Sequence, residues 1–399
     1  MTQAIEQIPE ALADATRHQP RARVALASAL VSPGHAYLFR GPRGSGKALA
    51  ARAFAAELLV AGAPDPDDAR RRALLDPSPH PDLVWLRPPG AQHLVEDVPE
   101  SVIRASSLTP AEGERRVFVI EEAEDLRDES QNALLKTLEE PAPFAHLILI
   151  CSEPELLAET ILSRCAPVEF GSLAPAAVEE ALGLEEGGPA AARLSGGDVE
   201  LARLLASERG AALRATAEAA ARAPLSDVDA RARDSATRFM LEPWRELLEA
   251  ASEAGQAAGA EEERRLLEEA ETMRKRGRSG DARAPRGGSR GATRLTGEAT
   301  EQVRRTERRA RTQALDLGLA LCCVWYRDLA AIASGAEDVV LNDDRRAELA
   351  EDAEGLDPAR ARRAVEWMLD TRRRLRVNVS EELALEALWL RLASALSAA

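Results

Sequence analysis

The stretch that decides the fold is a glycine-rich loop, Gly41-Pro42-Arg43-Gly44-Ser45-Gly46-Lys47-Ala48, which has the form G-x-x-x-x-G-K. An apolar run precedes it at residues 36–39, and a helical pattern follows it at residues 47–59. In this context the glycines turn backbone amides toward phosphate oxygens, and the helix N-terminus adds partial positive charge. Lys47 is one of only three lysines in the chain, which favours a phosphate-binding role over a chance match. We therefore predict that residues 41–48 contact a nucleotide.

The surrounding sequence predicts a doubly wound parallel sheet. Between residues 36 and 170, short apolar runs alternate with amphipathic stretches, as strands and helices alternate in an α/β domain. After Gly171 the strand signal stops, and Ala, Leu, Glu and Arg recur at helical spacing to the end, which predicts an all-helical second half. The predicted strands are residues 36–39, 83–86, 117–120, 147–151 and 168–170, and the predicted helices between them are residues 47–59, 100–108 and 130–138.

Two features weaken the loop as a hydrolytic site. Ala48 stands where a Ser or Thr hydroxyl would bind the magnesium of a nucleotide. After the run at residues 117–120 comes the pair Glu121-Glu122, in which the longer Glu121 replaces the aspartate of an active Walker B element. Glu122 could still polarise a water molecule as a residual catalytic group. The alternative, that both carboxylates are only solvated at a strand end, stays open.

Composition limits the classes of function. The net charge of -15 would repel a DNA backbone on average, so nucleic-acid contact must come from a local patch or from partner subunits. The four cysteines lack C-x-x-C spacing, which predicts reduced thiols. No apolar stretch reaches the roughly 18 residues of a membrane span, and we expect a soluble cytoplasmic protein without a membrane partner.

Two further strings carry a specific resemblance. They are Asn132-Ala133-Leu134-Leu135-Lys136-Thr137-Leu138-Glu139-Glu140-Pro141 and Ser163-Arg164-Cys165. The first resembles the helix signature of the AAA+ clamp loaders of bacterial DNA polymerase III, and the second resembles their SRC sequence. The similarity extends to His35-Ala36-Tyr37-Leu38-Phe39, to His80-Pro81-Asp82-Leu83 and to residues 378–390, and so covers nearly the whole chain.

The resemblance implies a domain organisation. An AAA+ P-loop domain is expected at residues 1–170, a small helical lid at 171–222, and a helical collar for oligomerisation at 223–399. Within the collar, residues 274–297 are rich in Gly, Ser and Arg and show no apolar periodicity, which predicts a flexible linker or long loop.

The resemblance also implies a role for Arg164. In the family, the SRC arginine reaches the ATP site of a neighbouring subunit, where it senses the γ-phosphate and stabilises the transition state. Arg164 is therefore the catalytic residue expected to act in trans. The implied partners are gamma/tau and delta subunits in a hetero-pentameric ring, and, through the ring, the sliding clamp and primer–template DNA.

Among clamp-loader subunits the chain is more similar to delta-prime than to gamma/tau. It lacks the hydroxyl residue and the Walker B aspartate, and residues 61–79 hold none of the cysteines of the family's zinc module. The arginine of the family's sensor-2 region aligns with Glu200, although Arg203 could substitute. We expect ATP or ADP to be held rather than hydrolysed, with weak or no Mg²⁺ binding and no zinc. A self-sufficient ATPase and a scaffold that binds no nucleotide remain as alternatives.

Overall fold

The computed structural model describes residues 8–88, 99–106, 108–183, 187–225, 242–278, 289–375 and 379–396. The chain divides into two compact units, the first within residues 1–184 and 195–202 and the second within residues 185–194 and 203–399. The division into three domains at residues 170 and 222 stays a prediction.

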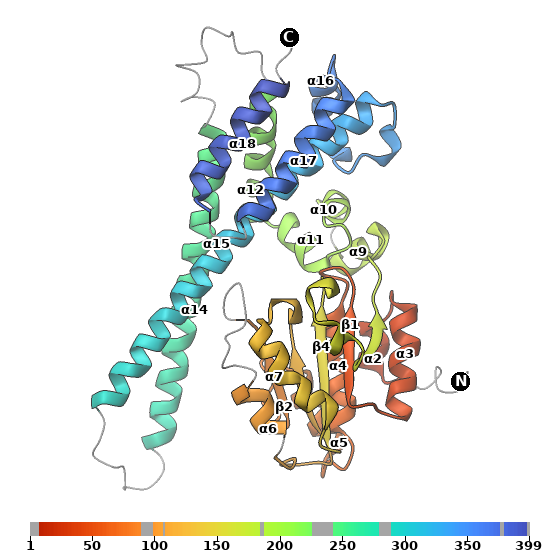
Figure 1. Ribbon diagram of the computed structural model, residues 1–399, viewed down its shortest axis with the longest axis vertical. Helices are drawn as coiled ribbons and strands as arrows, with labels where there is room; N and C mark the ends of the chain where they lie inside the picture. Colours follow the sequence, from red (N-terminus) through yellow and green to blue (C-terminus); the bar gives the residue numbers. More distant parts are fainter. Residues whose placement is uncertain are drawn as a thin grey trace. The chain divides into compact units, whose positions relative to one another are not determined.

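A five-stranded sheet forms the centre of the first unit (Figure 1). All its strand pairs are parallel and their order is β2-β3-β4-β1-β5, which confirms the predicted doubly wound sheet. The fifth strand begins earlier than the predicted 168–170, because Tyr37 on β1 pairs with Ala166. The strands are β1 (Ala36–Arg40), β2 (Leu83–Leu86), β3 (Arg116–Ile120), β4 (Ala145–Cys151) and β5 (Ala166–Glu169).

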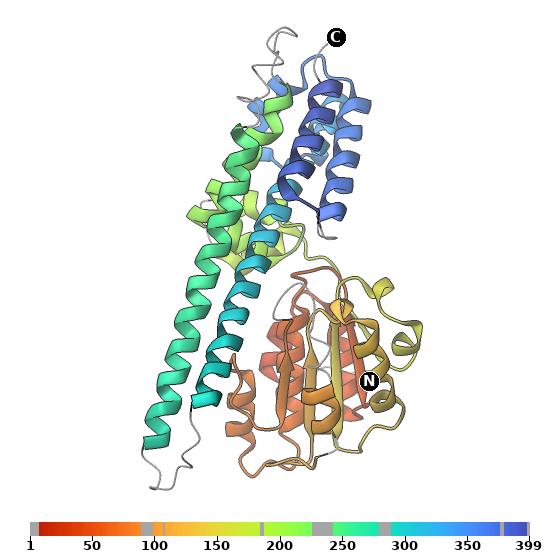
Figure 2. The ribbon, with the colours of Figure 1, turned by 60° about the vertical axis from the view of Figure 1, so that its left-hand side comes forward.

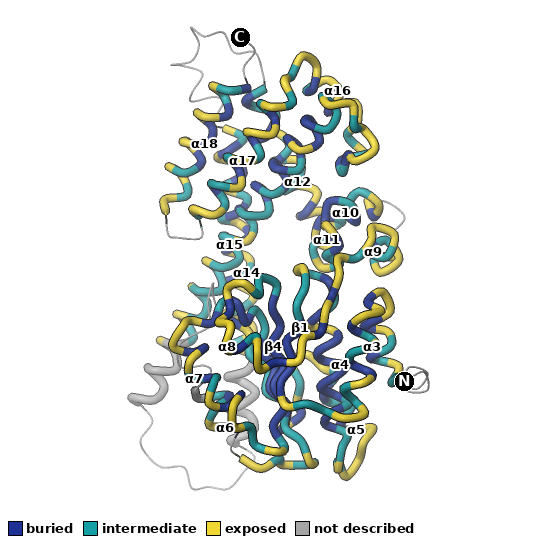
Figure 3. The backbone as a smooth tube through the Cα atoms, turned by 45° about the vertical axis from the view of Figure 1, so that its right-hand side comes forward, coloured by how far each residue is buried: buried dark blue, intermediate teal, exposed yellow. Residues whose placement is uncertain are grey.

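Helices cover both faces of this sheet. Since alternate side chains of a strand point to opposite faces, Phe39 packs into the core on one face and Leu38 into the core on the other. Strand β4 is buried along its whole length (Figure 3). The first face is covered by α2 (Glu10–Ala15), α3 (Pro20–Val31), α4 (Lys47–Leu59) and α5 (Pro66–Leu74), and the second by η1 (Pro99–Ile103), α6 (Arg104–Ser106), α7 (Asp128–Glu139) and α8 (Glu159–Leu162).

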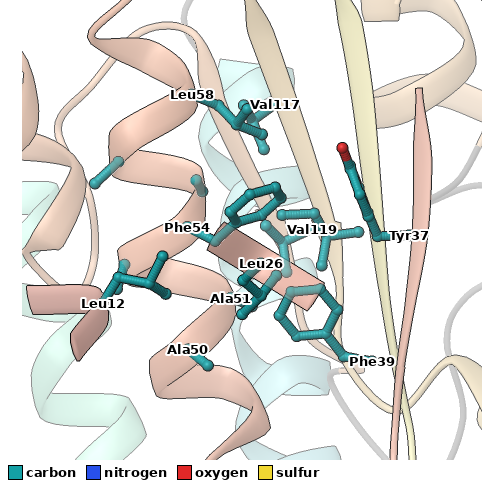
Figure 4. Packing of buried hydrophobic residues seen from close by; sticks show 14 of the residues in the cluster. Leu12, Leu26, Tyr37, Phe39, Ala50, Ala51, Phe54, Leu58, Val117 and Val119 are labelled. Atoms are coloured by element: carbon teal, nitrogen blue, oxygen red, sulfur yellow. The ribbon is translucent and has the colours of Figure 1, made fainter. Parts of the chain in front are cut away.

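Helix α4 positions the glycine-rich loop against the sheet. Its bounds match the predicted 47–59, and its many alanines allow a close approach to the strands. The ring of Phe54 meets that of Tyr37 edge-on at a centroid distance of 5.0 Å and lies 6.2 Å from that of Phe39 (Figure 4). Burying one such aromatic side chain contributes about 1.5–3 kcal/mol, so this contact fixes the start of α4 relative to β1.

Helix α5 lies within residues 61–79, the stretch that contains no cysteine. Ala69 and Ala73 are buried, and the helix packs on α4. Arg70 donates to both carboxylate oxygens of Glu57, with Nε to Oε1 at 2.6 Å and Nη2 to Oε2 at 3.1 Å. The side chain of Glu57 is only 7% exposed, so this two-pronged ion pair ties α5 to α4.

The second unit is helical in its described part, as predicted. Trp244, Trp325 and Tyr326 are fully buried, and the Tyr326 hydroxyl donates to the carbonyl of Ala221 at 2.7 Å. Its helices include α10 (Gly188–Leu194), α12 (Glu208–Arg222), α14 (Glu242–Arg278), α15 (Ser289–Ala333), α16 (Arg346–Ala353), α17 (Pro358–Leu375) and α18 (Glu381–Leu396). No described helix is both long and apolar enough to cross a membrane.

Helices α14 and α15 lie side by side as a long pair (Figure 2). A side chain at Gly255 would meet the carbonyl oxygen of Glu307 at 2.7 Å, so a residue without Cβ allows the two helices to approach. The predicted loop at residues 274–297 is corrected at both ends, because α14 continues to Arg278 and α15 begins at Ser289. Residues 274–278 are mostly Arg and Lys, which are good helix formers and sustain a helix without apolar periodicity. Residues 279–288 of that prediction lie outside the described residues.

Candidate functional site

The glycine-rich loop follows β1 and leads into α4. Gly46 has φ +88°, a left-handed conformation that favours glycine, and Lys47 is the first residue of α4. Gln19 holds the loop from the side, because its Nε2 donates to the carbonyls of Ser45 at 3.0 Å and Gly171 at 2.8 Å. The Gly171 amide in turn donates to Gln19 Oε1 at 2.8 Å. One buried amide side chain thus ties the loop to the segment that follows β5.

Lys47 turns into its own loop. Its Nζ donates to the carbonyl oxygens of Gly41 at 2.6 Å and Pro42 at 2.5 Å, and the residue is 5% exposed. Burial lowers the pKa of this ammonium to about 8, although the nearby Glu124 carboxylate acts in the opposite direction. The cation that should meet a phosphate is therefore already bonded to protein oxygens.

The rest of the loop presents little chemistry for magnesium. Pro42, Arg43 and Ala48 are exposed, and Ala48 carries no oxygen. The hydroxyl of Ser45 is buried and has no hydrogen-bond partner within the described residues. The hydroxyl of Ser45 therefore lies three positions before Ala48, the position at which a magnesium-binding hydroxyl is needed.

Glu121 is held by an arginine at the end of β3. Arg87 Nε donates to Glu121 Oε2 at 3.0 Å, and the same guanidinium donates to both oxygens of Asp76 at 3.1 and 2.6 Å. The carboxylate at the predicted magnesium position therefore already has a cationic partner. The predicted role of Glu121 in nucleotide binding stays a prediction, and this ion pair opposes it.

Glu122 occupies an unusual backbone conformation. Its φ is +50° and its ψ is +52°, and its carbonyl accepts from the Asp125 amide at 2.9 Å as the turn η2 (Ala123–Asp125) begins. A left-handed residue other than glycine costs about 1–3 kcal/mol, and such strain is concentrated at functional sites. The residual catalytic role predicted for Glu122 is compatible with this conformation and remains a prediction.

Glu124 is a feature that the sequence reasoning missed. It is 7% exposed, and its Oε1 accepts from the Ser152 amide at the end of β4 at 3.0 Å. Its Oε2 is buried and has no hydrogen-bond partner within the described part of the chain. Burial and this carboxylate together raise the pKa of Cys151 to about 12. The third acidic residue in Glu-Glu-Ala-Glu was the available signal.

Asp198 is the second residue that was missed. It precedes α11 (Val199–Ala206), and its Oδ1 accepts from the Leu201 amide at 3.0 Å, as an N-cap does. A Cβ placed on Gly44 would lie 1.9 Å from Asp198 Cγ, so the aspartate is in direct contact with the loop. Glu200, on which the sequence reasoning focused, is exposed, as is Arg203.

Arg164 lies on the surface just after α8. Its Nη2 donates to Glu139 Oε1 at 2.7 Å, and its Nη1 donates to the Thr160 carbonyl at 3.0 Å and to Ser163 Oγ at 3.3 Å. The side chain is 35% exposed. A guanidinium has five N–H donors, and two of those of Arg164 have no acceptor among the described residues, so they could bind an external one. The following residue, Cys165, is buried and anchors the segment.

The strand order, the glycine-rich loop after β1 and the acidic pair after β3 define the class of the first unit. It is an AAA+-type P-loop domain.

Comparison with known proteins specifies the type. Residues 25–174 match the model of the family described as DNA polymerase III, delta subunit. DNA polymerase III subunit delta' of Bacillus subtilis is 33% identical over 162 residues, which are 40% of this chain and 49% of that protein. The corresponding subunit of Pseudomonas aeruginosa is 38% identical over 139 residues, 33% of this chain and 41% of that protein. The chain thus spans about half the length of these relatives or less.

A solved structure has a looser likeness over a longer range. A gamma subunit-related protein of DNA polymerase III from Thermotoga maritima is 16% identical, with a TM-score of 0.45 over 94% of this chain and 99% of that one. The family-model match lies within the first unit. The comparisons thus show that the P-loop domain of this chain is similar to clamp-loader subunits of the delta-prime type.

Proposed function

We propose that this chain is the delta-prime subunit of a replicative clamp loader and supplies Arg164 in trans to ATP bound by a neighbouring gamma/tau subunit. The observation that carries the proposal is the placement of Arg164, exposed and oriented by three acceptors, in the sequence Ser163-Arg164-Cys165. Its two remaining N–H donors suit a fork-like contact with phosphate oxygens.

Such a contact would contribute to catalysis by electrostatics. Charge builds up on the γ-phosphate oxygens during transfer, and an arginine supplied by a neighbour stabilises it. An arginine already held by Glu139 and Thr160 loses less side-chain entropy when it binds than a free one does. The ring would then use ATP energy from its gamma/tau subunits to open the sliding clamp and place it on primer–template DNA.

The chain's own loop fits hydrolysis poorly. Ala48 offers no magnesium ligand, Glu121 is paired with Arg87, and Lys47 bonds to carbonyls of its own loop. These contacts support a subunit that hydrolyses no ATP in cis and binds ATP or ADP weakly if at all, with little use for Mg²⁺. They argue against the alternative of a self-sufficient ATPase. They favour the alternative of a scaffold that binds no nucleotide, in which the loop has only a structural role.

The test is co-purification of the chain with gamma/tau and delta subunits, followed by the DNA-stimulated ATPase of the complex. We expect a stable complex whose ATPase falls when Arg164→Ala replaces the wild-type chain, while assembly stays intact. A complex that forms normally but hydrolyses ATP at the wild-type rate with Arg164→Ala would remove the role in trans. Failure to form any complex would remove the delta-prime assignment.

A further inference from the structure

The phosphate loop is in contact with an acidic residue of the chain itself. Gly44 lies in the middle of the loop, and a Cβ on it would lie 1.9 Å from Cγ and 2.0 Å from Oδ1 of Asp198. Gly44 has φ +66°, so both its conformation and the closeness of Asp198 require glycine. The carboxyl group of Asp198 is therefore packed directly on the backbone that would surround the phosphates.

A second carboxylate lies deeper in the same region. Glu124 is buried, and its Oε1 accepts from the Ser152 amide at 3.0 Å. Its Oε2 has no hydrogen-bond partner among the described residues. The charges of both Glu124 and Asp198 act on Lys47 in the direction that favours its protonated form. Lys47 thus has two intramolecular counter-charges in addition to its two carbonyl acceptors.

We propose that Asp198 is an internal blocker of the phosphate loop: its carboxylate occupies the place and the charge role of a nucleotide phosphate and excludes ATP and ADP. This inference deepens the proposed function, because it explains why the subunit's own phosphate loop would bind no nucleotide. It rests on the proposed function only for the consequence of this within the ring.

The physical basis is a competition between like charges. A di- or triphosphate that entered the loop would bring several negative charges next to Asp198 and Glu124, and like charges at contact distance repel strongly where water is scarce. Entry would also require Lys47 to leave the carbonyls of Gly41 and Pro42. The N-cap bond from the Leu201 amide holds the Asp198 side chain in place, so the blocker is built into the start of α11.

The test is equilibrium binding of a fluorescently labelled ADP to the full chain, read by polarisation with Mg²⁺ and with a chelator. Asp198→Asn keeps an N-cap side chain but removes the charge, and we expect affinity to rise about tenfold or more. The matched control is Glu200→Gln, which removes an exposed carboxylate from the first turn of the same helix. It should bind as wild type does. Adding Lys47→Ala to Asp198→Asn should abolish the gain.

Three results would overturn the proposal. They are wild-type affinity in Asp198→Asn, an equal gain in Glu200→Gln, or a gain that survives Lys47→Ala and so lies elsewhere. Asp198→Ser, which also caps helices well, replaces Asp198→Asn if that variant does not give the wild-type melting transition. Because the assay uses the isolated chain, its failure leaves the role of Arg164 in the complex standing, and the two proposals fail separately.

Discussion

The first unit contains two cationic side chains, Lys47 and Arg164, which differ in burial and in hydrogen-bond partners. Lys47 is 5% exposed and donates to carbonyls of its own loop, beside the carboxylates of Glu124 and Asp198. Arg164 is 35% exposed, and its three protein contacts leave two N–H donors for an outside acceptor. One cation is satisfied inside the chain, and the other is presented to solvent.

The difference between Lys47 and Arg164 shows how a nucleotide-binding fold can keep its architecture while its phosphate loop is occupied by contacts within the chain. Loss of one hydroxyl at Ala48 removes a metal ligand, but the surrounding contacts then neutralise the lysine and hold the loop through Gln19. The scaffold is retained because α4 and β1 still pack through Phe54. In the proposed function, the catalytic contribution comes instead from Arg164, on a different surface of the same unit, which would face a neighbouring subunit.

The largest effect is expected from Arg164→Lys in the reconstituted complex. Lysine keeps the charge but loses the planar fork, so the rate at the ATP site that it contacts should fall on the order of 10²-fold. The measurement is DNA-stimulated ATP turnover, with assembly checked by size-exclusion chromatography. Full activity with lysine would show that a positive charge is sufficient and that the planar guanidinium is not required.

The next largest effect is expected on the pH dependence of the unfolding free energy, through the buried Lys47. Burial lowers the pKa of Lys47 from 10.5 to about 8. Between those pH values the unfolded chain binds a proton that the folded chain does not, so this group makes stability rise as pH rises through the window. Relative to Lys47→Met, the wild type should gain up to about 3 kcal/mol of unfolding free energy from pH 8 to pH 10.5.

Urea unfolding of both proteins across that range is the measurement. Arg164→Met is the control at an exposed cation. Because arginine is not deprotonated in proteins, the difference in unfolding free energy between wild type and Arg164→Met should not change with pH. A constant difference between wild type and Lys47→Met would show that the lysine is not buried as described.

The smallest effect is expected from Glu139, which orients Arg164. Exposed ion pairs contribute about 0.2–1 kcal/mol, so Glu139→Gln should lower the ATPase of the complex by a factor of about 1.4 to 5. Glu140→Gln changes the adjacent exposed carboxylate, which has no contact with Arg164 among those described, and is the matched control. Equal rates for both variants would remove the positioning role of Glu139.

Much of the fold was predictable because its signals are local. Helix α4 has a glycine before it and an alanine-rich sequence within it, and four strands coincide with apolar runs whose side chains pack into the cores on both faces. Strand β5 was misplaced because Pro167 and Glu169 interrupt its apolar pattern, while its position is set by backbone pairing with β1. Pairing of this kind is tertiary and leaves no local signal.

The candidate site was predictable in its residues but not in its contacts. The loop and Ala48 were found from residue type and spacing, and Arg164 was found from the resemblance of Ser163-Arg164-Cys165 to the clamp-loader SRC sequence. The contact of Asp198 with Gly44 and the approach of Glu124 to the region of Lys47 join segments far apart in sequence. A single sequence gives no measure of such distances, so the reasoning selected Glu200, which proved to be exposed.

The central claim is that this chain contributes to catalysis in trans and not in cis. The most direct measurement compares ATP turnover by the isolated chain with turnover by the ring that contains wild type or Arg164→Ala. We predict no turnover by the isolated chain and a loss on the order of 10²-fold or more at the contacted site with Arg164→Ala. Turnover by the isolated chain that Lys47→Ala abolishes, together with an unchanged rate in the Arg164→Ala ring, would contradict the account.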